Sequence, residues 1–163
     1  GLFIAPSSSN GEFTGSFAER LNSLCEISVK EAQDGDLIKP GQALLARGDK
    51  QLVVSKSSGS FSVRFSGNQL VNGHCPSVDV LFSSVAQVIG EKAIGVILTG
   101  MGKDGAAGLG EIKSAGGWTI AQNQSSSIVF GMPKAAIEAG YASSVFSLSD
   151  IPSELVKNLQ GLN

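Results

Sequence analysis

Histidine, cysteine, methionine, tryptophan and tyrosine are all scarce in this sequence of 163 residues. His74 is the single histidine, and Cys25 and Cys75 form no CxxC pair. A zinc site needs a larger set of His and Cys ligands, so neither a metal nor a metal-based cofactor is expected. Isolated cysteines without a disulfide pattern suit a reducing compartment, and we therefore expect a cytoplasmic protein.

Runs of one charge and long apolar runs are also missing. Lys and Arg (12 together) nearly balance Asp and Glu (14) and form no cluster, so a surface for nucleic acid is not expected. No apolar run approaches the length of about 20 residues that a bilayer span needs, so membrane insertion is not expected. The 42% of hydrophobic and 16% of charged residues instead predict one compact domain with its own core.

The chain opens on GLFIAP, an apolar run typical of a core strand, with no initiator methionine before it. A core strand at the first residue indicates that the domain starts further upstream. We therefore expect residues 1–163 to form a single domain that is incomplete at its N-terminus.

Strand and helix patterns alternate along most of the chain. A β-branched apolar run at residues 94–98 predicts a central buried strand, with residues 118–121 as its parallel neighbour. Three short β-prone runs near 43–47, 51–56 and 61–65, separated by turn signals, predict an antiparallel meander at one edge. The predicted fold is α/β, with three layers in which helices cover both faces of a doubly wound, mainly parallel sheet.

Two helix starts carry capping signals. Ser77 precedes a run with helical apolar spacing and is expected to be its N-cap. Ser16, followed three residues later by Glu19, matches the capping box, so a second helix is expected to begin there.

The turn after the predicted strand at residues 94–98 carries the candidate site. Glycines at positions 100, 102, 105 and 108 allow a sharp turn and a close approach by another group. Asp104 lies where this turn enters a helix, at the carboxyl end of a strand. Open α/β sheets build their sites at that end.

Three interpretations of Asp104 stay open at this point. It can cap its own helix, a role in which asparagine serves nearly as well. It can belong to a dinucleotide site, because G-x-G-x-x-G follows the strand; the next strand, WTIAQNQ, lacks the ribose-binding acid, so no nucleotide cofactor is expected. It can also orient a catalytic histidine.

Several long motifs carry a specific resemblance. FTGSFAERLN, KEAQDGDLIKPGQALLARGDK, NGHCPSVDVLFSSVA, GVILTGMGKDGAAGL, WTIAQNQSSSIVFGMP and KAAIEAG follow one another in this order. The chain from about Phe13 to about Ser149 closely resembles the catalytic domain of the CheB chemotaxis methylesterases.

The resemblance implies a function and partners. Members of that family remove methyl groups, as methanol, from methylated glutamates on the cytoplasmic helices of chemoreceptors, and they deamidate receptor glutamines. An upstream response-regulator domain usually restrains the site. The implied partners are therefore chemoreceptor helices and a response-regulator domain, which is not present in residues 1–163.

The resemblance also implies site residues. The family uses a Ser-His-Asp triad, and it places the aspartate at Asp104 and a methionine of the oxyanion region at Met101, both in TGMGKDG. The family histidine position falls on Ser8, and the family serine lies in a turn before the first aligned residue. A serine without an imidazole base is not activated, so we expect the chain as given to be inactive.

Two alternatives stay open. Ser7 or Ser8 follows a predicted strand and, with His74 and Asp104, would give serine, histidine and aspartate in family order, although His74 matches a second family histidine beside the site. The chain can also be a non-catalytic receptor-binding or regulatory module of the same fold. Loss of the first strand and helix would leave an uncovered edge, which favours self-association.

Overall fold

The first half of the chain forms a three-stranded parallel sheet. The computed structural model describes residues 1–6 and 11–161. In this part of the chain, β1 (Leu2–Ile4) and β2 (Ser28–Glu31) both pair in parallel with β3 (Gln42–Leu45), so the strand order is β1-β3-β2.

The central position of β3 corrects the prediction of an antiparallel meander that includes residues 43–47. Residues 43–45 are at most 2% exposed, as is typical of a parallel strand covered on both faces. The antiparallel part is a two-stranded hairpin of β4 (Leu52–Ser57) and β5 (Ser60–Phe65). A short apolar run does not distinguish a hairpin strand from a buried parallel strand, and this ambiguity produced the error.

Helix α1 (Gly11–Leu24) covers one face of the first sheet, where Ala18 packs against Ala43 and Leu45. The prediction that this helix begins at Ser16 is wrong. Ser16 lies inside the helix, and its hydroxyl donates to the Phe13 carbonyl at 3.1 Å.

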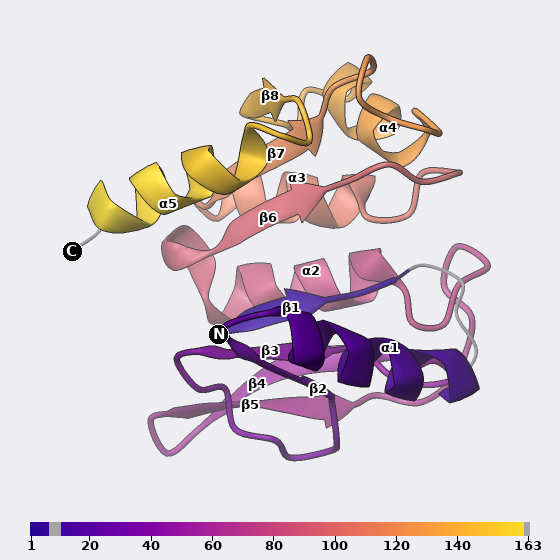
Figure 1. The fold of residues 1–163 in the computed structure, drawn as a ribbon, viewed down its shortest axis with the longest axis vertical. Helices are drawn as coiled ribbons and strands as arrows, with labels where there is room; N and C mark the ends of the chain where they lie inside the picture. Colours follow the sequence, from indigo (N-terminus) through magenta and orange to yellow (C-terminus); the bar gives the residue numbers. More distant parts are fainter. Residues whose placement is uncertain (7–10, 162–163) are drawn as a thin grey trace.

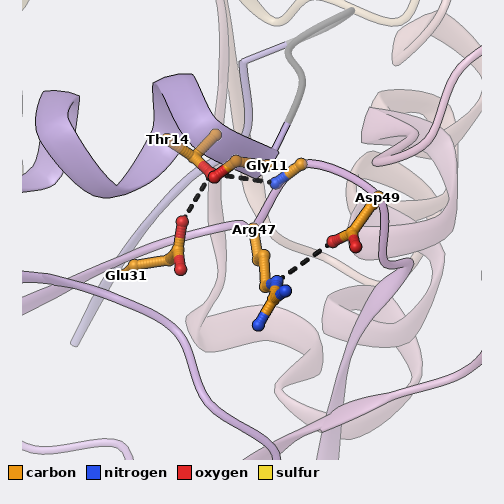
Figure 2. A network of polar contacts seen from close by, with 6 residues as sticks. Gly11, Thr14, Glu31, Arg47 and Asp49 are labelled. Carbon is orange, nitrogen blue, oxygen red and sulfur yellow. Dashed lines mark hydrogen bonds and ion pairs between the residues drawn. The ribbon is translucent and has the colours of Figure 1, made fainter.

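A buried threonine fixes the start of α1, as Figure 2 shows. Thr14 is 0% exposed, and its hydroxyl donates to the Glu31 carboxylate in β2 and accepts from the N–H of Gly48 at 3.1 Å. Arg47 and Asp49 form an ion pair of 3.0 Å beside it. These contacts connect α1 to β2 and to the loop after β3, at the carboxyl end of the sheet.

The second half of the chain forms another three-stranded parallel sheet. β6 (Ile94–Ile97) pairs with β7 (Trp118–Gln122), which pairs with β8 (Ser144–Phe146). The predicted pairing of residues 94–98 with residues 118–121 is therefore confirmed.

The prediction that residues 94–98 are the central strand is wrong for this hydrogen-bonded sheet, whose order is β6-β7-β8. Burial agrees with that order. Residues 119–122 of β7 are 0% exposed, whereas Ile94 and Val96 of β6 are half-buried. A short apolar run in the sequence therefore does not distinguish an edge strand of a sheet from a central one.

Helices α2 (Val78–Val88) and α3 (Ala106–Ser114) pack on one another and cover the face opposite α1 (Figure 1). Leu81 of α2 and Ile112 of α3 share a core cluster with Leu44. Neighbouring strand residues face opposite sides of a sheet, so Leu44 points away from the α1 side. The remaining elements are η1 (Gly90–Lys92), α4 (Met132–Glu138) and α5 (Ile151–Gly161).

The α/β class and the mainly parallel arrangement with helices on both faces are thus confirmed. Within residues 1–6 and 11–161, the helices are not of a length and apolar character that would cross a membrane.

Candidate active site

The topology places the candidate site between the carboxyl ends of β1 and β6. The chain after β1 continues into α1 on one face of the sheets, and the chain after β6 continues into α3 on the other (Figure 1). Such a reversal opens a crevice at the carboxyl ends of the strands, where α/β proteins bind ligands. Residues 99–105 connect β6 to α3 at this end of the sheet. Ser7 and Ser8 follow β1 and lie outside the described residues.

The glycine turn after β6 is fixed to the segment before α4. The Gly100 carbonyl accepts from the N–H of Met132 at 2.9 Å, and a Cβ on Gly131 would lie 2.7 Å from that carbonyl oxygen. The N–H of Thr99 donates to the side chain of Gln122 at 2.8 Å. Gly105 has φ +91°, a left-handed conformation that favours glycine. These hydrogen bonds and the close approach at Gly131 therefore hold the turn in one backbone conformation.

Asp104 is 1% exposed, and its carboxylate caps α2. Oδ1 accepts from the Ser77 hydroxyl at 2.7 Å, and Oδ2 accepts from the N–H of Val78 at 2.7 Å. Two weaker hydrogen bonds to Oδ1 come from the Asn72 amide at 3.2 Å and the Asp79 N–H at 3.3 Å. The carboxylate thus satisfies N–H groups that the first turn of α2 leaves free.

The expectation that Asp104 caps its own helix is therefore wrong. The N-cap residue of α3 is Gly105, which has no side chain for this purpose. The cap comes from α2 instead, because the Asp79 carboxylate accepts from the N–H of Gly108 in the first turn of α3 at 2.7 Å. Each of the two helices is thus capped by a carboxylate from the N-terminal segment of the other: α2 by Asp104 and α3 by Asp79.

Ser77 is the N-cap of α2, as the sequence predicts. Its hydroxyl accepts from the N–H of Val80 and donates to Asp104. Its own N–H donates to the Gln51 side chain at 2.8 Å, and Ser77 is 0% exposed.

Asn72 and Asp79 are further site residues, which were not expected from the sequence. The Asn72 amide nitrogen donates to Oδ2 of Asp79 at 2.7 Å as well as to Asp104. Asn72 has φ +54°, which asparagine tolerates better than most residues. Both lie in the NGHCPSVD motif, so the motif itself was the signal that could have located them.

Burial raises the pKa of the Asp79 carboxyl above its ordinary value. The like charge of Asp104 raises this pKa further. The N–H of Gly108 and the Asn72 amide lower it, because both stabilise the charged form through hydrogen bonds. The paired carboxylates thus repel one another across the junction of α2 and α3.

His74 is not hydrogen-bonded to Asp104 in the described part of the chain. Its N–H and carbonyl pair with those of Val71 in an isolated bridge, and the carbonyl also accepts from the Gln51 side chain at 3.0 Å. The imidazole Nδ1 is buried and has no hydrogen-bond partner among the residues described. The structure thus does not bring His74 and Asp104 together as a catalytic pair.

Met101 is 79% exposed, in the same turn as the fully buried Asp104. The two residues of this turn therefore differ strongly in their exposure to solvent. The expectation from the sequence that Asp104 lies in a depression at the carboxyl ends of the strands, near Met101, stays a prediction.

The described residues contain no group of three or more His, Cys, Asp and Glu side chains arranged to hold a metal ion.

The fold and this site define an α/β protein with a buried carboxylate at the carboxyl ends of its parallel strands. The chain belongs to the CheB methylesterase family, which matches residues 5–155. The structure of the CheB methylesterase catalytic domain of Thermotoga maritima superimposes with a TM-score of 0.91 at 39% identity, covering 95% of this chain and 82% of that chain.

Curated relatives agree with this assignment. A protein-glutamate methylesterase/protein-glutamine glutaminase of Salmonella typhi is 52% identical over 147 residues, which is 90% of this chain and 42% of the relative. The protein of the same name from Chromohalobacter salexigens is 53% identical over 150 residues, or 92% of this chain and 42% of that protein. The chain thus spans less than half the length of these relatives.

Replacing Asp104 by asparagine tests the cap. The sequence alone predicts a mild effect on stability. In the structure, however, the NH2 group of asparagine would face at least one of the donors whose hydrogen bonds the Asp104 carboxylate now accepts. A lost hydrogen bond to a buried charge and an unsatisfied donor predict a loss of about 2–4 kcal/mol in the free energy of unfolding. Urea denaturation measures it, with the exposed Asp150→Asn as control. A loss equal to that of the control would contradict the assignment.

The raised pKa of Asp79 predicts a pH dependence of stability. The folded protein binds this proton more tightly than the unfolded chain does, so the contribution of Asp79 is greatest below pH 3.8 and is lost as pH rises through the raised pKa. Asp79→Asn keeps a carbonyl acceptor for Gly108 and removes the titration. The stability of the wild type relative to this variant should therefore fall as pH rises above 3.8, measured by urea denaturation at several pH values.

Asp34 supplies a control of opposite sign. The N–H of Phe65 lowers the pKa of the Asp34 carboxyl, with help from Arg64. The advantage of the wild type over Asp34→Asn should therefore be lost as pH falls through the lowered pKa. Parallel pH profiles for the two variants would contradict the electrostatic account of Asp79.

Proposed function

We propose that this chain is the ester-hydrolase domain of a chemotaxis protein that acts on methylated glutamates of chemoreceptor cytoplasmic helices. The reaction would release methanol, and the same site would deamidate receptor glutamines. Membership of the CheB methylesterase family supports this, as do the names of the curated relatives. The observation that carries the proposal is the position of Asp104, in TGMGKDG at the carboxyl end of β6.

The chemistry assigns a role to each group. A serine hydroxyl attacks the ester carbonyl, an imidazole takes its proton, and a carboxylate keeps that imidazole in the correct tautomer. Asp104 is our candidate for the carboxylate, and Met101 for a residue of the oxyanion region. The four donors around Asp104 fix its orientation before any partner binds.

We propose further that the chain as given hydrolyses receptor esters negligibly. Ser8 stands where the family has its triad histidine, and no serine at the family's nucleophile position is present in the sequence. A hydroxyl without a general base stays protonated at neutral pH and is a poor nucleophile. Asp104 cannot replace the imidazole, because it is already buried against α2.

The alternative triad of Ser7 or Ser8, His74 and Asp104 has less support. It requires a hydrogen bond from the imidazole to Asp104, whereas Nδ1 of the His74 imidazole is buried without a hydrogen-bond partner among the described residues.

A non-catalytic receptor-binding or regulatory module of the same fold is the second candidate function. It is favoured by one observation: Asp104 serves as a buried structural cap. In either case the proposed partners are chemoreceptor helices and a response-regulator domain, and the proposed location is the cytoplasm. We also propose that residues 1–163 belong to a single domain that can self-associate.

Methanol release from methylated chemoreceptor tests the proposal that this chain hydrolyses receptor esters negligibly. We expect the rate for this chain to be at least about 1,000-fold below that of the Thermotoga maritima catalytic domain, since binding and oxyanion contacts alone supply only residual catalysis. Methanol release within tenfold of that control would contradict it. If His74→Ala then abolished the release, the alternative triad would be the correct one.

Binding to receptor helices separates the two candidate functions. A pull-down with methylated receptor fragments should show binding without hydrolysis if the chain is a non-catalytic module. Absence of both binding and hydrolysis would contradict that module.

A further inference from the structure

Asn72 and Gly73 form the tip of a tight turn beside Asp104. The N–H of Val71 donates to the His74 carbonyl, and the N–H of His74 donates to the Val71 carbonyl, both at 2.9 Å. Asn72 has φ +54° and Gly73 has φ +80°, so both central residues are left-handed. Two left-handed residues closed by such a pair make a type I′ turn, for which Asn-Gly is a favoured sequence.

The tip of this turn is exposed, whereas its base is held by the rest of the protein. Asn72 and Gly73 are both exposed. At the base, the Gln51 side chain donates to the carbonyl of His74 at 3.0 Å. The pairing of Val71 with His74 is an isolated bridge outside the named strands. A two-residue hairpin without a sheet behind it is only marginally stable in water, so the tip opens far more easily than the whole protein unfolds.

The Asn72 amide holds this tip against the junction of α2 and α3. Its nitrogen donates to Oδ2 of Asp79 at 2.7 Å and to Oδ1 of Asp104 at 3.2 Å. An ionised carboxylate only accepts hydrogen bonds, so an amide can bridge two carboxylates but a third carboxylate cannot. Hydrolysis of this one amide would therefore turn an attractive contact into a repulsive one.

Asn-Gly is also the sequence in which an asparagine side chain reacts most readily with its own backbone. The nitrogen of the following residue attacks the side-chain carbonyl carbon, and glycine has no Cβ to obstruct that approach. The bond from the Gly73 nitrogen to Cγ of Asn72 forms, the bond from Cγ to Nδ2 breaks, and the proton of the Gly73 nitrogen leaves with Nδ2 as ammonia. Water then opens the cyclic imide and leaves aspartate or isoaspartate at position 72.

We propose that Asn72 is a self-modification site, at which deamidation replaces the amide between Asp79 and Asp104 by a third carboxylate and loosens the junction of α2 and α3. The reaction starts when the turn opens, because the closed turn keeps the amide on the two acids. The loss of ammonia is irreversible in water, so the modification accumulates with the age of the protein. It does not depend on ester hydrolysis by this chain.

Peptide mass spectrometry of the incubated protein tests the site. After incubation in mildly alkaline buffer, we expect the mass change of an amide converted to a carboxyl group at Asn72. The rate at Asn68 should be lower by on the order of tenfold or more, because Asn68 is followed by Gln69 rather than by glycine. Asn10 also precedes a glycine, but it lies on another tryptic peptide and is measured separately. An unchanged Asn72, or equal rates at Asn72 and Asn68, would overturn the proposal.

The rate at Asn72 also shows which opening of the protein permits the reaction. A synthetic peptide of residues 68–76 gives the rate for a turn that is always open. The rate in the folded protein, divided by the rate in the peptide, should match the fraction of time for which the His74 N–H is open, as measured by hydrogen exchange. A rate that instead follows global unfolding would overturn the proposal, because the folded protein would then not modify itself.

Asn72→Asp carries the charge of the deamidated product, and aspartate tolerates a left-handed backbone as asparagine does. We expect its unfolding equilibrium constant to exceed that of the wild type by on the order of tenfold, and this difference to narrow at high salt, which screens the repulsion. Asn68→Asp makes the same charge change at an exposed position of the same loop and should leave the constant unchanged. Equal effects of the two substitutions, or an effect insensitive to salt, would overturn the proposal.

Wild-type protein that deamidates after folding repeats the test, so a folding defect in Asn72→Asp does not decide the matter. Its extra negative charge allows ion exchange to separate it from the unreacted protein. In the deamidated form we expect faster hydrogen exchange at the amides of Val78 and Gly108, whose N–H groups Asp104 and Asp79 hold. Equal exchange at these two amides in the two forms would overturn the proposal.

Discussion

The hydrogen bonds that Asp104 and Asp79 accept from the N-terminal segments of α2 and α3 join the two halves of this molecule. One carboxylate caps α2 through Val78, and the other caps α3 through Gly108. Because β1 and β6 are not hydrogen-bonded to each other in the described residues, the sheets are connected mainly through these two packed helices. The position of the glycine turn, and so of the candidate site, depends on this junction.

The Asp104 carboxylate therefore has a structural role and also occupies the position of a site residue. A buried acid that accepts four hydrogen bonds is held in one orientation, which is what preorganised electrostatic stabilisation requires. The arrangement has a cost, since Asp79 is brought close to a like charge and its pKa rises. Asn72 offsets part of that repulsion by donating to both carboxylates. Stability and site geometry are thus coupled through Asp104.

Local signals in the sequence predicted much of this, and non-local contacts explain the rest. The N-cap at Ser77 and the pairing of residues 94–98 with 118–121 follow from short patterns, and the structure confirms them. The burial of β3 between α1 and α2 cannot be read from a run of five residues, so its strand was placed in a meander. Asp104 was expected to cap the helix that follows it, because its actual partner, α2, lies more than twenty residues earlier and is reached only by folding.

Native-state hydrogen exchange at the Val78 amide tests the central claim most directly. If Asp104 caps α2, this amide exchanges in the wild type only through global unfolding, although the first turn of a helix is normally poorly protected. In Asp104→Asn its protection should fall by more than the loss of global stability accounts for. Fast exchange of Val78 in the wild type, or an equal loss of protection at every core amide in the variant, would contradict the account.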